Sequence, residues 1–265
     1  MTEQRVTVTV SDGVADVRLN RPDKRNALDH AMFDGIFAAA DQVANDASVR
    51  VVVLSGVGKA FCAGLDTSLL SQMAGERTTE STTIDGLFRN LRVDAPRAVR
   101  VWTELAVPVI AAVHGVAVGG GIQLALGADF RIVAPDAQLG ALEMRWGIIP
   151  DMCGTQLLPR LVGPDQAKLL MMTARTISGE EALRIGLATQ VADDPYAVAH
   201  ELARELALRN PDGITAIKRL VGIAQDLPFA EGMQQEYDLA GPVIGTANQR
   251  EAVMANLEGR PPQFS

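Results

Sequence analysis

An almost continuous apolar run at residues 49–56, VRVVVLSG, most strongly constrains the fold of this chain. The run ends in glycine and shows no regular polar alternation, which is typical of a strand that is covered on both faces. A progression from strand to turn to helix recurs over residues 109–126. This alternation of strands and helices favours an α/β core.

The beginning of the chain predicts a hairpin followed by a helix. Apolar and polar residues alternate over 6–10, Ser11-Asp12-Gly13 supplies a turn, and 14–19 runs back. We expect a helix from about Asp29, which can cap its N-terminus, to Val43. Further on, FRIVAPDAQLG at 130–140 indicates two more short strands.

The second half of the chain is increasingly helical in pattern. Ser178 and Glu181 form a capping box ahead of a helix, whereas the polar segment 68–100 predicts a solvated loop leading into an amphipathic helix. From Pro195 onward the apolar stripes are typical of helices in a core or a subunit interface. We therefore divide the chain into a core, residues 1–195, and a C-terminal helical oligomerisation region, residues 196–265.

Composition excludes several classes of protein. The chain has 265 residues, of which 48% are hydrophobic and 21% charged, so it can bury a sizeable core. Its net charge of -8 argues against a nucleic-acid partner but permits a small anionic ligand held by a local positive cluster. Cys62 and Cys153 lie far apart in the sequence, which favours free thiols in a reducing cytosol. No signal peptide is evident. We expect a cytoplasmic protein.

Residues 105–128 carry no formal charge and are numerous enough to cross a bilayer. Pro108, His114, Gln123 and five glycines interrupt this stretch, and no second such segment exists. The stretch divides more naturally into a β-rich piece, a glycine turn and a helix start. We therefore expect no membrane association.

The glycine turn is Gly119-Gly120-Gly121, within VGGGIQLALG. A strand that ends there and opens a helix presents unpaired N–H groups, which can hold a phosphate or a carbonyl oxygen that becomes an enolate. Close packing against a neighbouring strand explains the glycines equally well. A second glycine turn, KAFCAGLD at 59–66, follows the buried strand and can supply another N–H to the same oxygen.

Two acids stand among apolar residues in GALEMRWGIIPDMCGTQLL, namely Glu143 and Asp151. Burial raises the pKa of a carboxyl group and suits it to proton transfer near neutral pH. Each acid can also be an exposed loop residue or a helix cap, and Arg145 can pair with Glu143. The three histidines lack metal-ligand spacing, and neither a metal motif nor a serine nucleophile elbow is present.

Five segments together resemble the crotonase superfamily, also called the enoyl-CoA hydratase/isomerase family. They are LNRPDKRNAL, GKAFCAGLD, PVIAAVHGVAVGGGIQLALGADFRIV, LGALEMRWGIIPDMCGTQLLPRLVG and TISGEEALRIGLATQV. The resemblance implies a spiral of β-β-α repeats with a C-terminal helical trimerisation region, and trimers that often pair into hexamers. It also implies a CoA thioester substrate, with coenzyme A as part of the substrate and no separate prosthetic group.

The resemblance further implies an oxyanion hole, in which the backbone N–H groups of Leu65 and Gly120 hold the thioester oxygen. The expected contacts with the adenine end of CoA come from two stretches of the chain, Lys24, Arg25 and Ala27 in one and Ala63 to Asp66 in the other. Lys24 and Arg25 also supply local positive charge for an anionic ligand, although a solvated surface pair explains them as well.

The chain departs from the family's hydratases at two positions, Gln123 and Asp151. Those enzymes carry glutamates at the positions of Gln123 and Glu143, and an amide cannot exchange a proton as a carboxylate does. Asp151 stands where hydratases usually have glycine, and its spacing from Glu143 is similar to that in dienoyl-CoA isomerases. Those isomerases carry aspartate at the Gln123 position, however, and single-glutamate enoyl-CoA isomerases offer a third comparison.

We therefore predict three catalytic-site residues: Glu143 as the main acid/base, Asp151 as a second proton carrier, and Gln123 as a residue that orients a water or the substrate by hydrogen bonding. Isomerisation of an enoyl- or dienoyl-CoA is favoured over hydration of a 2-enoyl-CoA. A catalytically silent acyl-CoA-binding protein is the alternative from another class, and the negative charge disfavours an RNA-binding relative. The expected assembly is a homotrimer or a dimer of trimers.

Overall fold

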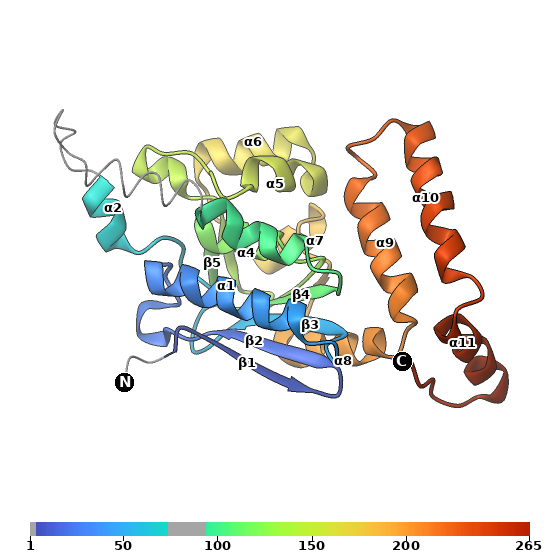
Figure 1. Ribbon diagram of the computed structural model, residues 1–265. Helices are drawn as coiled ribbons and strands as arrows, with labels where there is room; N and C mark the ends of the chain where they lie inside the picture. Colours follow the sequence, from blue (N-terminus) through green and yellow to red (C-terminus); the bar gives the residue numbers. More distant parts are fainter. Residues whose placement is uncertain (1–3, 74–93) are drawn as a thin grey trace, which may run out of the picture.

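The computed structural model describes residues 4–73 and 94–265, and its centre is a six-stranded sheet of order β1-β2-β3-β4-β6-β8 (Figure 1). The strands are β1 (Val6–Ser11), β2 (Val14–Leu19), β3 (Val51–Gly56), β4 (Val109–Val113), β6 (Phe130–Val133) and β8 (Gln190–Val191). The β1–β2 hairpin is antiparallel, as predicted, and the remaining pairs are parallel. A second sheet pairs β5 (Val116–Val118) with β7 (Gln138–Gly140).

The chain winds between the two sheets as a spiral. Strand β4 continues into β5 and then α4 (Gly120–Leu126), and β6 continues into β7. One turn earlier, the segment after β3 reaches the second sheet through a bridge between Cys62 and Ala117. Gly115, at φ +61°, separates β4 from β5, so the apolar run at 109–118 forms two strands. This arrangement matches the predicted β-β-α repeats.

Strand β3 is buried along its whole length, which explains the apolar run of its first four residues, Val51 to Leu54. Val51 and Val53 belong to the apolar cluster that includes helix α8 (Pro195–Ala207). Val52 and Leu54 belong to the cluster that includes α1 (His30–Asn45) on the opposite face. Because successive side chains of a strand point to opposite faces and both faces are covered, positions 51–54 of β3 are all apolar.

The remaining helices surround this core. They are the 3₁₀ helices η1 (Pro22–Lys24) and η2 (Glu143–Trp146), with α2 (Thr67–Met73), α5 (Gly154–Val162), α6 (Pro164–Thr173), α7 (Gly179–Arg184), α9 (Pro211–Ile223), α10 (Phe229–Val243) and α11 (Ala247–Glu258). The predicted caps are present, since Asp29 accepts from Met32 N at 2.8 Å and Ser178 accepts from Glu181 N at 3.1 Å. Residues 94–103 are helical, whereas 74–93, most of the predicted polar loop, lie outside the described residues.

The C-terminal helices divide into two groups. Helix α8 packs on the sheet through Ala199 and Ala203, so the boundary expected at 195/196 lies after the first residue of a helix that packs on the core. Helices α9 and α10 stand beside the core as a pair, with α11 below them (Figure 1). Lys218 attaches α9 to the core, because its Nζ lies 2.9 Å from Asp129 Oδ2 and donates to Val107 O at 2.9 Å.

Two further predictions concern the whole chain. Both cysteines are free, as expected. Among residues 4–73 and 94–265, no helix combines the length and the apolar character that crossing a membrane requires.

We predict that Ala203→Leu destabilises the protein by about 1–3 kcal/mol, because the added carbons must fit between α8 and the sheet, where Ala203 is fully buried. Ala197→Leu is the matched control, since Ala197 lies on the exposed side of the same helix. Urea unfolding of both variants measures the difference. Equal midpoints for the two variants would contradict the assignment of α8 to the core.

Candidate active site

Two successive windings of the spiral meet where the predicted glycine turns lie, at residues 59–66 and 119–121. Val118 N donates to Cys62 O at 3.2 Å, and Leu28 N donates to Gly64 O at 2.8 Å. The approach is so close that a Cβ atom placed on Gly64 would lie 2.6 Å from Val118 O and 3.2 Å from Gly120 N. The backbone of residues 62–66 therefore lies directly against the start of α4.

This arrangement leaves two backbone donors free at the junction. Leu28 pairs with Gly64 O and with Asp66 N, so the N–H of Leu65 between them points to the other side. Gly120 is the first residue of α4 and its N–H has no partner within the helix. In the part of the chain that the structure describes, neither N–H donates a hydrogen bond. Their positions fit the predicted oxyanion hole.

The glycines serve both purposes that the sequence left open, namely close packing and the exposure of a backbone N–H group. Gly119 adopts φ 56° and ψ -127°, a conformation that essentially only glycine tolerates, and it turns β5 into α4. Gly121 packs so tightly that a Cβ atom there would collide with the carbonyl oxygen of Cys62. Close packing and an exposed N–H are thus two results of the same turn.

A pocket of about 570 Å³ opens at this junction. It is lined by Ala63, Gly64, Leu65, Thr67, Leu70, Val118, Gly119, Gly120, Leu142, Glu143, Trp146 and Ile148. Four predicted site residues are among them, namely Ala63, Leu65, Gly120 and Glu143. The apolar lining was not predicted. Trp146, which is 59% exposed, could have indicated it, because a tryptophan stands three residues after a candidate acid.

Glu143 begins η2 and is 6% exposed. Its Oε1 accepts a hydrogen bond of 2.6 Å from Gln123 Nε2, whereas Oε2 is buried and has no partner among the described residues. Burial raises the pKa of this carboxyl group and the nearby charge of Asp151 adds to the rise, against hydrogen bonds that lower it. Arg145 does not pair with Glu143, because its Nε donates to Ala174 O at 2.9 Å.

Gln123 lies behind Glu143 and is 1% exposed. Its Oε1 accepts hydrogen bonds from Met152 N at 2.9 Å and from Gly154 N at 3.0 Å. The side chain therefore contacts Glu143 and the backbone that begins α5, and it does not line the pocket at the glycine turns.

Asp151 stands in the exposed turn before α5. Neighbouring protein removes part of its hydration and raises the pKa of its carboxyl group. Its charge makes a smaller contribution to the raised pKa of Glu143, but Asp151 is not among the residues that line the pocket at the glycine turns. Among the residues that the structure describes, no cluster of side chains is suited to a metal ion.

The predicted CoA contacts lie on the strip next to the pocket. Lys24 and Arg25 are exposed, and Arg25 O accepts from Ala63 N at 2.9 Å, which places the two predicted stretches side by side. Ala27 is buried. The Asp66 carboxylate accepts from Ser68 N at 2.8 Å and pairs with Arg21 at 2.6 Å.

Through these contacts the Asp66 carboxylate is bound within the protein. Hydrogen bonds from Ser68, followed by the contribution of Arg21, hold the pKa of Asp66 at about 2. The carboxylate therefore stays charged and caps the start of α2, so its side chain orders the loop that carries Leu65.

Asn26 supports the site but was not among the predicted residues. Its Nδ2 donates to Val57 O at 3.0 Å and Ala60 O at 2.8 Å, and its Oδ1 accepts from Arg21 N at 2.8 Å. The side chain is fully buried and ties the 21–28 segment to the loop after β3. The signal in the sequence was a lone amide immediately before the apolar pair Ala27-Leu28.

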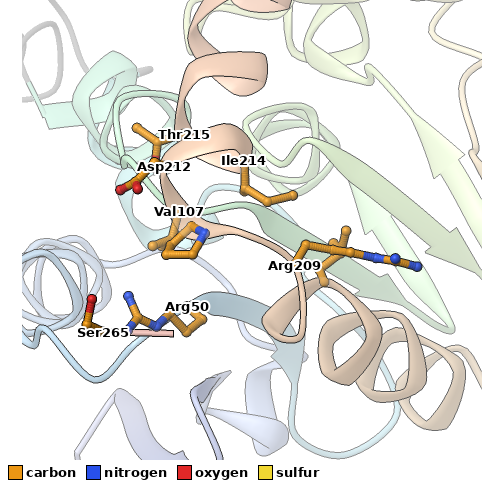
Figure 2. A pocket seen from close by; sticks show the side chains of 9 residues that line it. Arg50, Val107, Arg209, Asp212, Ile214, Thr215 and Ser265 are labelled. Atoms are coloured by element: carbon orange, nitrogen blue, oxygen red, sulfur yellow. The ribbon is translucent and has the colours of Figure 1, made fainter. Parts of the chain in front are cut away.

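A separate hollow of about 620 Å³ lies where α8 meets α9 (Figure 2). Arg50 and Ser265 face each other there, whereas the guanidinium of Arg209 points away. Asn248 holds Asp212 and Ser265 together through its amide, at 3.2 and 3.3 Å. This hollow contains none of the predicted site residues, so the candidate site is the pocket at the glycine turns.

Comparison with known proteins identifies the family of the chain. Residues 9–265 match the family model for enoyl-CoA hydratase/isomerase. A probable enoyl-CoA hydratase of Bacillus subtilis is 32% identical over 98% of both chains. The 1,2-epoxyphenylacetyl-CoA isomerase of Escherichia coli is 34% identical over 97% of this chain and 96% of that one.

A solved structure shows the same fold. The crystal structure of an enoyl-CoA hydratase from Bacillus anthracis covers 98% of this chain and 99% of that chain, with a TM-score of 0.90 and 34% identity. The family model, the curated relatives and this structure agree over nearly the whole length. The chain therefore belongs to the enoyl-CoA hydratase/isomerase family, has the crotonase fold, and is an enzyme of acyl-CoA metabolism.

Proposed function

We propose that this protein moves a double bond along the acyl chain of an enoyl- or dienoyl-CoA, with Glu143 as the residue that carries the proton. One observation supports this most directly. The Oε2 atom of Glu143 is buried, has no hydrogen-bond partner among the described residues, and belongs to a side chain that lines the pocket of the free Leu65 and Gly120 donors.

In this mechanism the thioester oxygen accepts hydrogen bonds from the Leu65 and Gly120 N–H groups. Glu143 removes a proton from carbon, and the electron pair moves to the thioester oxygen as an enolate, which the two donors stabilise. The same carboxyl group then returns the proton to a different carbon. The double bond has shifted, and no water is consumed. With a conjugated diene, Asp151 serves as the second proton carrier.

The amide at position 123 favours isomerisation over hydration. Water addition needs a group that takes a proton from water and a group that delivers one to carbon. Gln123 cannot exchange a proton, and both ends of its amide already bond within the protein. Hydration of a 2-enoyl-CoA remains the second candidate, because relatives with high similarity are named as hydratases.

We also propose where the adenine end of CoA binds and which surface the subunits use to assemble. Lys24 and Arg25 meet the negatively charged adenine end of CoA beside Ala63, and the loop that Asp66 orders forms the wall of that site. The exposed apolar residues of α9 and α10, among them Ile217, Val221, Phe229, Met233 and Tyr237, become buried in a homotrimer or a dimer of trimers.

Ultraviolet difference spectra with 2-enoyl-CoA and with 3,5-dienoyl-CoA separate the candidates. We expect a new band at longer wavelength with the diene, because isomerisation to the 2,4-diene extends the conjugation. Loss of the enoyl-thioester absorbance with the first substrate alone would show hydration instead. A 3-enoyl-CoA is tested as well, because its isomerisation creates the enoyl-thioester absorbance. Tight binding of all three thioesters without any spectral change would identify a silent acyl-CoA-binding protein.

Glu143→Gln is expected to lower kcat by about 10²–10⁴-fold, the usual contribution of a positioned acid or base. CoA-thioester affinity, measured by calorimetry, stays near that of the parent, because the amide keeps the shape of the side chain. Glu180→Gln, on the exposed side of α7, is the matched control and leaves kcat unchanged. Turnover of Glu143→Gln within a few-fold of the parent would refute the role of Glu143.

Activity should rise with pH and reach its plateau above the ordinary pKa of a glutamic acid. Glu143 must be ionised to accept a proton, and burial raises its pKa, so the protonated, inactive form persists to higher pH. A kcat/KM profile from pH 4 to 9 measures this. An acid limb at or below the ordinary glutamate value would contradict the assignment.

A further inference from the structure

Gln123 is the buried side chain on which the geometry of Glu143 depends. It is fully enclosed, 20 residues before Glu143 in the chain, and belongs to α4, whereas Glu143 belongs to η2. The orientation of its amide is unambiguous, because Met152 N and Gly154 N are donors and require the oxygen on their side. The Nε2 group must then face Glu143, as it does at 2.6 Å.

We infer that Gln123 is a positioning residue, which binds Oε1 of Glu143 and so leaves Oε2 as the single oxygen that exchanges a proton with the substrate. The inference rests on the proposed function in so far as Glu143 is the proton carrier. It assigns to Gln123 no contact with substrate, and it differs in this from the hydrogen bond to water or substrate expected from sequence.

The chemistry of the position explains why an amide is present. The side chain must accept from two N–H groups at the start of α5 and donate to a carboxylate at the same time. An ionised acid could accept both N–H groups but would place two negative charges 2.6 Å apart. A glutamine is neutral, carries an acceptor and a donor on opposite sides, and has the required length.

The same amide also couples the two acids of the site. Through its oxygen it fixes the backbone at Met152 and Gly154, directly after Asp151. Through its nitrogen it fixes Glu143. Among the described residues, Asp151 is the charged group that acts on Glu143, since Arg145 is turned to Ala174 O. Gln123 therefore sets the relative placement of both carboxyl groups.

Gln123→Met tests the inference, because methionine has nearly the same length but neither donates to Glu143 nor accepts strongly from α5. We expect kcat to fall by about 10²-fold with KM changed little, since the carboxyl group loses its fixed orientation. Gln156→Met is the matched control, because Gln156 lies on the exposed side of α5. It should leave kcat, KM and Tm unchanged.

A second measurement does not depend on activity. Protein labelled with ¹³C at the Glu side-chain carboxyl carbons allows the titration of Glu143 to be followed by NMR, with the signal assigned by its loss in Glu143→Gln. The hydrogen bond from Gln123 favours the ionised form, so Gln123→Met should move the midpoint to higher pH. An unchanged midpoint and an unchanged kcat would overturn the inference, whatever happens to Tm.

Gln123→Glu provides a test if Gln123→Met fails to fold, because it keeps the acceptor for Met152 N and Gly154 N. Below the pH at which the pair loses its shared proton, the protonated side chain can donate to Glu143; above it, the two carboxylates repel. We expect kcat to fall with rising pH, opposite to the parent, and a parent-like profile would overturn the inference. If the NMR midpoint moves in Gln123→Met but the parent turns over none of the three thioesters, the positioning role stands and the proposed function fails.

Discussion

Backbone pairing between successive turns of the spiral is the constraint on which the site depends. Leu28 forms a parallel bridge with Leu65, and Cys62 forms one with Ala117, so three chain segments run side by side over a few residues. In the part of the chain that the structure describes, the N–H groups of Leu65 and Gly120 have no acceptor at this junction. The donors are therefore fixed by the fold itself, and the buried amide of Asn26 secures the loop that carries one of them.

The electrostatics of the site follow from that placement. Two N–H groups, one of them at a helix start, create a local region that stabilises negative charge on an oxygen. Beside them stands a buried carboxyl group whose own ionisation is disfavoured by burial and by Asp151. An acid with a raised pKa is a stronger base once ionised, so the same burial that costs stability makes proton removal from carbon feasible.

Features set by local sequence were predictable, and those set by tertiary contacts were not. The buried strand β3, the hairpin and the Asp29 cap follow from patterns of a few residues. The glycine turns could be located from the sequence. The hydrogen bond between Gln123 and Glu143, however, joins residues that lie on different elements of the fold, and no local pattern encodes it. The same is true of Asn26 and of the ion pair between Arg21 and Asp66, which spans 45 residues. Local spacing could place Asp66 near the site but could not show that its carboxylate was already engaged.

The division between backbone donors and side-chain acids also explains how one fold serves several reactions. Relatives at 32% and 34% identity carry the names of a hydratase and an isomerase, although they align over nearly the whole of this chain. An oxyanion hole made of backbone N–H groups needs only the glycine turns and the strand pairing, so it tolerates wide change elsewhere. The reaction is then decided by the few side chains that face the enolate and by those that hold them. In this chain an amide stands behind the one carboxyl group found in the described lining of the pocket, which is why our proposal assigns proton transfer to Glu143, with Asp151 as its neighbour along the chain.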